Sequence, residues 1–341
     1  MNLHWDILSR YRSELMGISI LWIVLFHTVA WKHNQLPGVM SDLYGLLFHG
    51  YLGVEIFLLL SGIGLYYSLQ KNGSLSHFYR KRLQRLLLPY LTVGLCFFGY
   101  YDLLISGHVG QFIKDISLYS FWAEGNRILW FIALIIPLYI VYPGIFKIVN
   151  SDHFLIKIGL LICAVYVGMI VLKMADFKAY VKIEIALTRI PIFLLGGAMG
   201  RLVYEKAPIK DWLKLLLFVV VCFGLYAFNH KNFAVVNWKA YRGYFSIFCV
   251  PFAYWIAVWL SCISYKPFSI LLKRIGEMSL ELYLVHVTIM NILIKTSFYK
   301  ESGNGLWLFL LVVVLGSLVI SYILHYQIFP FIYRKMERKS L

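Results

Sequence analysis

Charged side chains are scarce in this chain. Only 14% of its 341 residues are Asp, Glu, Lys or Arg, whereas 61% are hydrophobic. A soluble fold could not cover that much apolar surface with so few polar groups. The scarcity therefore excludes an ordinary soluble protein and predicts an all-α, polytopic membrane bundle.

The usual motifs of metal, nucleotide and serine chemistry are also missing. The five cysteines lie in apolar stretches without CxxC spacing, and the chain has no P-loop, GxGxxG, HExxH, GxSxG or zinc pattern. We therefore expect no metal site and no permanently bound cofactor. The start of the chain lacks the pattern of a cleavable signal peptide. No Ser- or Gly-rich linker interrupts the sequence, which predicts one domain over residues 1–341 with no soluble domain appended.

Long apolar runs are what the sequence has in abundance. At roughly 20 apolar residues per membrane crossing, they predict about ten transmembrane helices. The expected spans are 14–33, 51–69, 86–105, 128–146, 154–172, 186–204, 212–228, 244–263, 276–296 and 306–332. No internal repeat is evident, which disfavours a transporter built from duplicated halves.

The net charge of +16 belongs mainly to short loops between these runs. Such residues set topology and contact anionic lipid, so the charge is no sign of nucleic-acid binding. The larger share of the 32 Lys and Arg residues falls on one side if both termini are cytoplasmic. We predict that orientation, as an even number of spans requires.

One titratable group, His27, lies inside the first predicted span, and Glu55 lies inside the second. An ionisable group at membrane depth marks a functional site by default. If the two helices are neighbours, the carboxylate can hold one tautomer of the imidazole, which makes the other ring nitrogen a base. Two alternatives stay open: His27 hydrogen-bonds a neighbouring helix without further role, and Glu55 reaches the outer surface.

A basic run, YRKRLQR, precedes the third span. Arg82 and Arg85 are three residues apart and so share one helical face. Paired guanidinium groups suit phosphate. The alternative is a simple topology anchor.

Other polar positions are sparser. Glycines at 196, 197 and 200 predict a face for tight helix packing, and Ser61 with Gly62 fits a close helix contact. Trp130 and Arg189 fit the membrane interface, where a sugar could also stack on the ring. In the ninth span, Glu281 and His286 lie deep enough to need a partner or a cavity.

Together these motifs resemble the acyltransferase-3 family of integral membrane acyltransferases over essentially the whole chain. The resemblance rests on the order of ILWIVLFHT, LGVEIFLLLSGIGLYY, YRKRLQRLLLPY, RILWFIALI, RIPIFLLGGAMGR and IGEMSLELYLVH. Each motif alone is weak, but their order and spacing are specific.

The resemblance implies transfer of an acyl group, usually acetyl and sometimes succinyl, from cytoplasmic acyl-coenzyme A to a hydroxyl of a surface or exported glycan. It assigns His27 and Glu55 to catalysis. It assigns the arginine pair Arg82 and Arg85 to the donor, and we add Tyr90 from the same motif.

We expect the acceptor side to include Trp130, Arg189, Ser61 and His286. One departure is notable. Many members carry an arginine eleven residues before the histidine, where this chain has Met16. Arg12, one turn earlier, is placed to serve the same face.

The expected partners are acetyl-CoA or succinyl-CoA, a glycan or lipid-linked sugar, and membrane lipid in the cell membrane. A homodimer is left open. A glycan or lipid flippase without acyl chemistry is the main alternative function, and a non-catalytic scaffold is the second.

Overall fold

A computed structural model describes residues 4–30, 47, 49–229, 238–263, 265–295 and 305–338. The predicted end of the first span at 31–33, the last residue of the ninth at 296, and Lys339 lie outside these ranges. In the described part the chain is helical, and its only extended pairing is an isolated bridge between His4 and Pro208.

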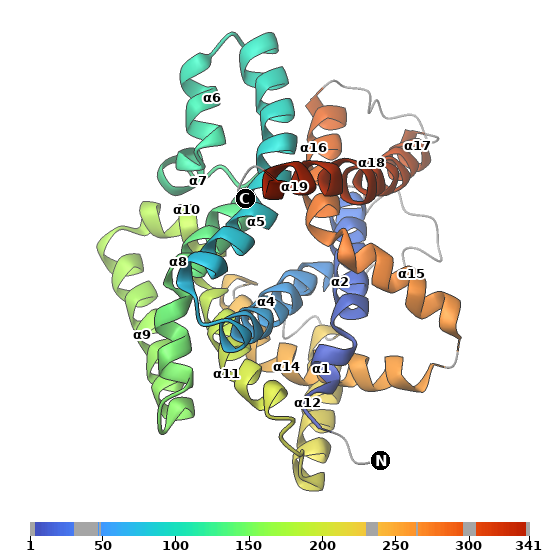
Figure 1. The fold of residues 1–341 in the computed structure, drawn as a ribbon. Helices are drawn as coiled ribbons and strands as arrows, with labels where there is room; N and C mark the ends of the chain where they lie inside the picture. Colours follow the sequence, from blue (N-terminus) through green and yellow to red (C-terminus); the bar gives the residue numbers. More distant parts are fainter. Residues whose placement is uncertain are drawn as a thin grey trace.

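The first half of the chain contains both central and outer helices of the bundle (Figure 1). Its helices are α1 (Ile7–Arg10), α2 (Arg12–Ala30), η2 (His49–Tyr51), α4 (Leu52–Lys71), α5 (Leu75–Phe98), the π-helical η3 (Gly99–Ile105), α6 (Val109–Ile116), α7 (Tyr119–Glu124), α8 (Trp130–Val149) and α9 (Phe154–Ala175).

The second half of the chain completes the bundle. Its helices are α10 (Phe177–Leu187), α11 (Ile190–Tyr204), α12 (Asp211–Asn229), α14 (Trp238–Cys262), α15 (Lys266–Glu277), α16 (Ser279–Lys295), α17 (Gly305–Leu311), the π-helical η4 (Val312–Gly316), α18 (Ser317–Ile323), the π-helical η5 (Leu324–Ile328) and α19 (Phe329–Arg338).

Six helical stretches of the described chain are long and apolar enough to cross a membrane, and a bent pair makes a seventh. The six are His49–Lys71, Leu75–Ile105, Trp130–Val149, Phe154–Ala175, Phe177–Tyr204 and Leu308–Met336, and the pair is Lys266–Glu277 with Ser279–Ile294. The protein is thus a multi-pass helical bundle. Helices α2, α12 and α14 coincide with three further predicted spans, and a total of ten stays a prediction, as does the orientation of the termini.

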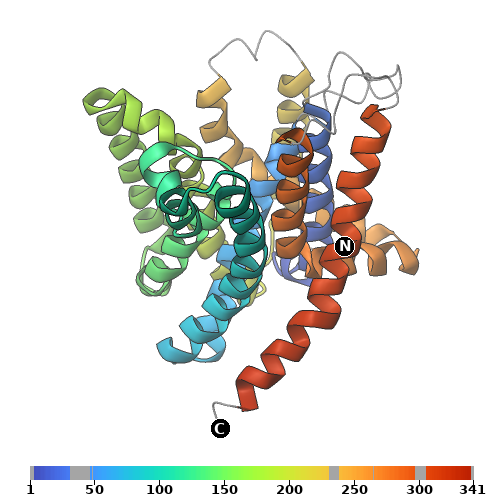
Figure 2. The ribbon, with the colours of Figure 1, turned by 90° about the horizontal axis from the view of Figure 1, so that it is seen from above.

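The predicted span at 276–296 corresponds to α16, and α15 is an additional helix before it. The two helices meet at a 69° bend, and Figure 2 shows α15 lying across the bundle while α16 runs along it. Helix α15 carries Lys266, Lys273 and Arg274 among apolar residues, so it is amphipathic. Its glycine Gly276 lies so close to Ser13 and Gly17 of α2 that a Cβ would not fit there.

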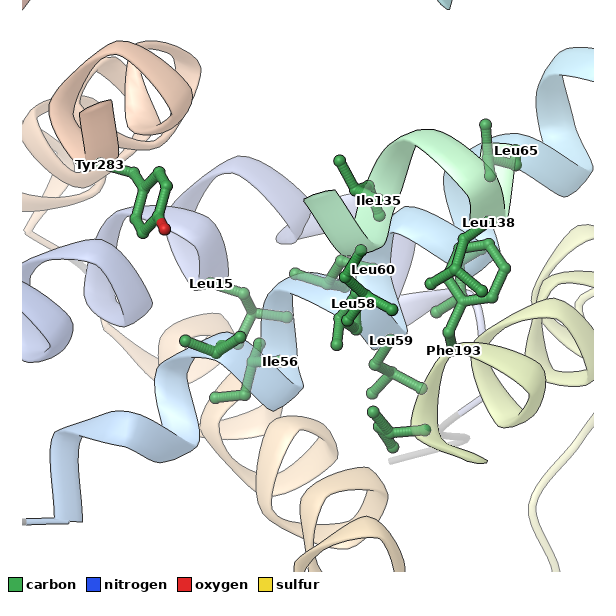
Figure 3. Close-up of a cluster of buried hydrophobic side chains, with 14 of the residues drawn as sticks. Leu15, Ile56, Leu58, Leu59, Leu60, Leu65, Ile135, Leu138, Phe193 and Tyr283 are labelled. Atoms are coloured by element: carbon green, nitrogen blue, oxygen red, sulfur yellow. The ribbon is translucent and has the colours of Figure 1, made fainter. Parts of the chain in front are cut away.

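The core forms around α4, which is largely buried. Figure 3 shows its leucines between Leu15 of α2, Ile135 and Leu138 of α8, and Phe193 of α11. The predicted glycine face is confirmed, because a Cβ on Gly62 of α4 would lie 2.6 Å from the backbone of Gly196 and Gly197. Small residues let these two backbones approach closely.

The outer helices are apolar where they are exposed. On α9, for example, Leu160 and Met174 are 65% and 83% exposed. Apolar surface on this scale requires lipid around it. The bundle therefore presents α9 to the bilayer.

Candidate active site

A cavity of about 140 Å³ lies between α2, α4, α5, α8 and α16. Arginines line one end, and apolar and aromatic side chains line the rest. The cavity therefore joins an anion-binding end to an apolar interior.

The basic end is built from Arg12 of α2 and from Arg82 and Arg85 of α5. Arg82 donates an Nη2 hydrogen bond of 2.7 Å to the Gly64 carbonyl, and Arg12 Nε lies 3.4 Å from the Leu60 carbonyl. Two of the three guanidinium groups are thus fastened to α4. No acidic side chain is among the described residues that line the cavity, so the positive charges repel one another and favour an anion.

Arg12 lies near Met16, the position at which the sequence departs from the resembling family. Both Arg12 and Met16 line the cavity from α2, one helical turn apart. The sequence-based expectation that Arg12 serves the same face as position 16 is therefore consistent with the geometry.

The cavity ends near two histidines. Its lining includes Ile23 of α2 and Tyr283 of α16, which precede His27 and His286 by four and three residues. His27 Nδ1 lies 2.9 Å from His286 Nε2, and the two rings stack with centroids 5.2 Å apart. The fully buried His286 also places its Nδ1 2.8 Å from the Leu282 carbonyl. Both histidines thus lie about one helical turn beyond the lining.

These contacts select one tautomer for each neutral ring. A carbonyl oxygen only accepts hydrogen bonds, so His286 Nδ1 carries the proton and donates it to Leu282. His286 Nε2 is then an acceptor, and His27 Nδ1–H donates to it. The Nε2 atom of His27 is left with its lone pair, as a general base requires.

Glu55 forms an ion pair with Arg189, the residue at the junction of α10 and α11. Arg189 Nε lies 3.2 Å from Glu55 Oε1, and the two side chains are 3% and 0% exposed. The guanidinium also donates to the Ile185 carbonyl and stacks over the Trp130 ring at 4.7 Å. This arrangement differs from the predicted Glu55–His27 pair. In the structure Glu55 contacts Arg189, and His27 contacts His286. The sequence contained both buried charges but no sign of how the helices are rotated.

The remaining predicted residues separate into two groups. Ser61 lines the cavity. Tyr90 does not appear among the described lining residues; its hydroxyl donates 2.7 Å to the Ile116 carbonyl and so ties α5 to α6. A donor-binding role for Tyr90 stays a prediction. Trp130 and Arg189 are not among the described residues that line the cavity.

Glu281 was expected to need a partner at membrane depth, and it has one. Its Oε1 lies 3.0 Å from Nδ1 of His325 in the π-helical segment η5. Sequence reasoning did not select His325, because nothing in its apolar surroundings relates it to a residue 44 positions away.

The described residues contain no group of three or more His, Cys, Asp or Glu side chains that could bind a metal ion.

Comparison with known proteins gives one match. A family described as an acyltransferase domain, of the acyltransferase-3 type, matches residues 15–326. No curated protein and no solved structure matches significantly. The matched region contains His27, His286 and most of the cavity wall. Since the match covers most of its length, the chain belongs to the acyltransferase-3 family of membrane acyltransferases.

Proposed function

We propose that this protein transfers an acyl group, acetyl in the first place, from acyl-coenzyme A to a hydroxyl of a surface or exported polysaccharide or lipid-linked sugar. The supporting observation is that one cavity joins three arginines to the neighbourhood of the His27–His286 pair. A flippase would need a path for a whole sugar, whereas this cavity has a volume of only about 140 Å³.

The donor fits the cavity by charge and by size. Coenzyme A has phosphates at one end and a thioester at the end of a long arm. Arg12, Arg82 and Arg85 would hold the phosphates at the mouth. At about 140 Å³, the cavity is small beside ligand pockets of roughly 300–1,000 Å³. It therefore suits the narrow arm, with the nucleotide outside.

The distance along α2 also fits. Fifteen residues separate Arg12 from His27, which is about 22 Å at ~1.5 Å per residue. An extended arm anchored at the arginines would bring the thioester up to the histidines.

His27 would act as the base. Its Nε2 accepts the proton of the acceptor hydroxyl while the hydroxyl oxygen bonds to the thioester carbon. The C–S bond then breaks, and coenzyme A leaves with the proton from His27. An acyl-histidine intermediate is the alternative route. Glu55 and Arg189 would support the acceptor side of the site as a fixed ion pair, with the Arg189 guanidinium over the Trp130 ring.

The setting we propose is the cell membrane, with the arginines at the cytoplasmic side and no resident cofactor. The test is binding and turnover by the purified full-length protein. It should bind acetyl-CoA or succinyl-CoA and release free thiol when surface polysaccharide from cells lacking the gene is added. Neither binding nor thiol release with either donor would contradict the proposal and favour a flippase.

A further inference from the structure

Tyr283 is a buried polar group in the cavity wall that the steps above do not use. Its side chain is 6% exposed, and its hydroxyl has no hydrogen-bond partner among the residues that the structure describes. Figure 3 shows the hydroxyl turned away from α16, toward the space beside α2 and α4. Burying a hydroxyl without a hydrogen-bond partner costs free energy. In a functional cavity, a ligand atom that accepts its hydrogen bond would remove that cost.

The surroundings of Tyr283 place it beside the reacting end of the cavity. Its ring lies 5.8 Å from that of His286, one turn along α16, and 5.4 Å from that of Phe131. Phe131 also lines the cavity. Phe131 is the second residue of α8, where amides have no carbonyl partner within the helix.

We propose that the Tyr283 hydroxyl is the oxyanion donor of the acyl transfer, an inference that rests on the proposed function. As the acceptor oxygen bonds to the thioester carbon, the carbonyl π electrons move onto oxygen, and the Tyr283 O–H donates to that oxyanion. When the oxygen's electrons re-form the carbonyl, the C–S bond breaks and the thiolate takes the proton from His27. The Phe131 amide, at the positive end of α8, is the second donor.

Tyr283 suits this role better than the other candidates. The Arg189 guanidinium is already engaged by Glu55 and the Ile185 carbonyl. Neither Arg189 nor Trp130 belongs to the described lining of the cavity. Ser61 does line it, but it follows Leu60, whose carbonyl faces Arg12 at the basic end.

The test compares Tyr283→Phe with a matched control, Tyr254→Phe. Tyr254 is also buried, at 0% exposed, and its hydroxyl also has no described partner, but it packs against Trp5 away from the cavity lining. Each substitution removes one oxygen and keeps the ring. Two readouts apply: kcat for thiol release with surface polysaccharide, and the infrared carbonyl band of bound [1-13C]acetyl-CoA.

For Tyr283→Phe we expect kcat to fall roughly 10²–10³-fold, the usual effect of losing one oxyanion donor. Acetyl-CoA affinity should stay within about twofold, and the carbonyl band should move to higher wavenumber as its hydrogen bond is lost. Tyr254→Phe should match the wild type in both readouts.

These measurements distinguish a failure of the inference about Tyr283 from a failure of the proposed function. If the wild type transfers acyl groups but Tyr283→Phe keeps its kcat and its carbonyl band, the inference about Tyr283 is overturned and the proposed function stands. A loss of affinity alone, without a band shift, also overturns it. If the wild type binds neither acetyl-CoA nor succinyl-CoA, the proposed function fails and this inference fails with it.

Discussion

His27 Nδ1 lies 2.9 Å from His286 Nε2, and His286 in turn places its Nδ1 2.8 Å from the Leu282 carbonyl. This chain of three groups runs from the backbone of α16 to the last turn of α2. It holds both rings in one orientation and leaves one nitrogen of His27 free to accept a proton.

Replacing His27 with alanine should abolish turnover without preventing donor binding. A positioned general base contributes roughly 10²–10⁴-fold to a rate, so thiol release should fall by that factor or more. Because the arginines that hold the phosphates are untouched, acyl-CoA affinity in a binding titration should change little. A variant that keeps its turnover would remove His27 from the mechanism.

His286 should act through the tautomer of His27. In the wild type, 15N NMR of histidine-labelled protein should show the His27 proton on Nδ1. His286→Leu should move it to Nε2 and remove a large part of the roughly 10²–10⁴-fold contribution of the base. His286→Gln, whose amide oxygen can accept from His27, should restore part of the rate. Equal rates for Leu and Gln variants would argue for a packing role only.

Helix positions were largely predictable, because apolar run length reports membrane crossing directly. The predicted spans 128–146 and 154–172 differ from α8 and α9 by three residues or fewer at each end. The predicted span 86–105 missed the first turns of its helix, since α5 begins at Leu75. Those turns hold the basic run, whose polarity hides a helix that continues beyond the apolar core. Helix α15 was missed because it is short and amphipathic.

The site was predictable residue by residue but not pair by pair. Burial of charge in an apolar run singled out His27, Glu55, Glu281 and His286. Which of them meet depends on the rotation of each helix about its axis, and the sequence carries little information about that. The structure pairs His27 with His286, whereas the sequence predicted Glu55 as its partner, and it pairs Glu281 with His325, for which no partner was predicted.

The role of the basic end of the cavity can be tested with two arginine variants on the same helix, α5. Arg85 and Arg80 are both exposed on α5, and only Arg85 belongs to the described cavity lining. A hydrogen bond to a charged group is worth about 1.5–3 kcal/mol. Arg85→Gln should therefore weaken acyl-CoA binding roughly 10- to 100-fold.

Arg80→Gln should leave that affinity nearly unchanged. The effect of Arg85→Gln should shrink as salt is added, because an exposed charge is screened. Equal losses for both variants in a binding titration would mean that these residues anchor topology.

Variants of Arg12 and Met16 test whether a guanidinium at either position of α2 supports donor binding. Arg12→Met should weaken donor binding, since one of three cavity arginines is lost. The double variant Arg12→Met with Met16→Arg returns a guanidinium to the same cavity wall, at the position where many family members carry arginine. Its donor affinity should recover in part. An unchanged affinity in Arg12→Met would show that Arg12 only holds α2 to α4.

The Glu55–Arg189 pair should matter for stability as well as for the site. Removing one partner of a buried ion pair typically costs about 3–5 kcal/mol. Arg189→Met should thus lower the thermal unfolding midpoint of the detergent-purified protein markedly. The double variant Glu55→Gln with Arg189→Met should lose less than the two single effects combined, because no charge stays buried alone. Additive losses would show that the pair is not coupled.

We propose above that His27 is the base when an acyl group passes from a coenzyme A thioester to a surface glycan. Mass spectrometry of surface polysaccharide tests it most directly, in cells that lack the gene and carry either the wild-type chain or His27→Ala at equal membrane levels. The account predicts glycan fragments heavier by one acetyl or succinyl group with the wild type and unmodified fragments with His27→Ala. Identical fragment masses in the two strains would contradict it.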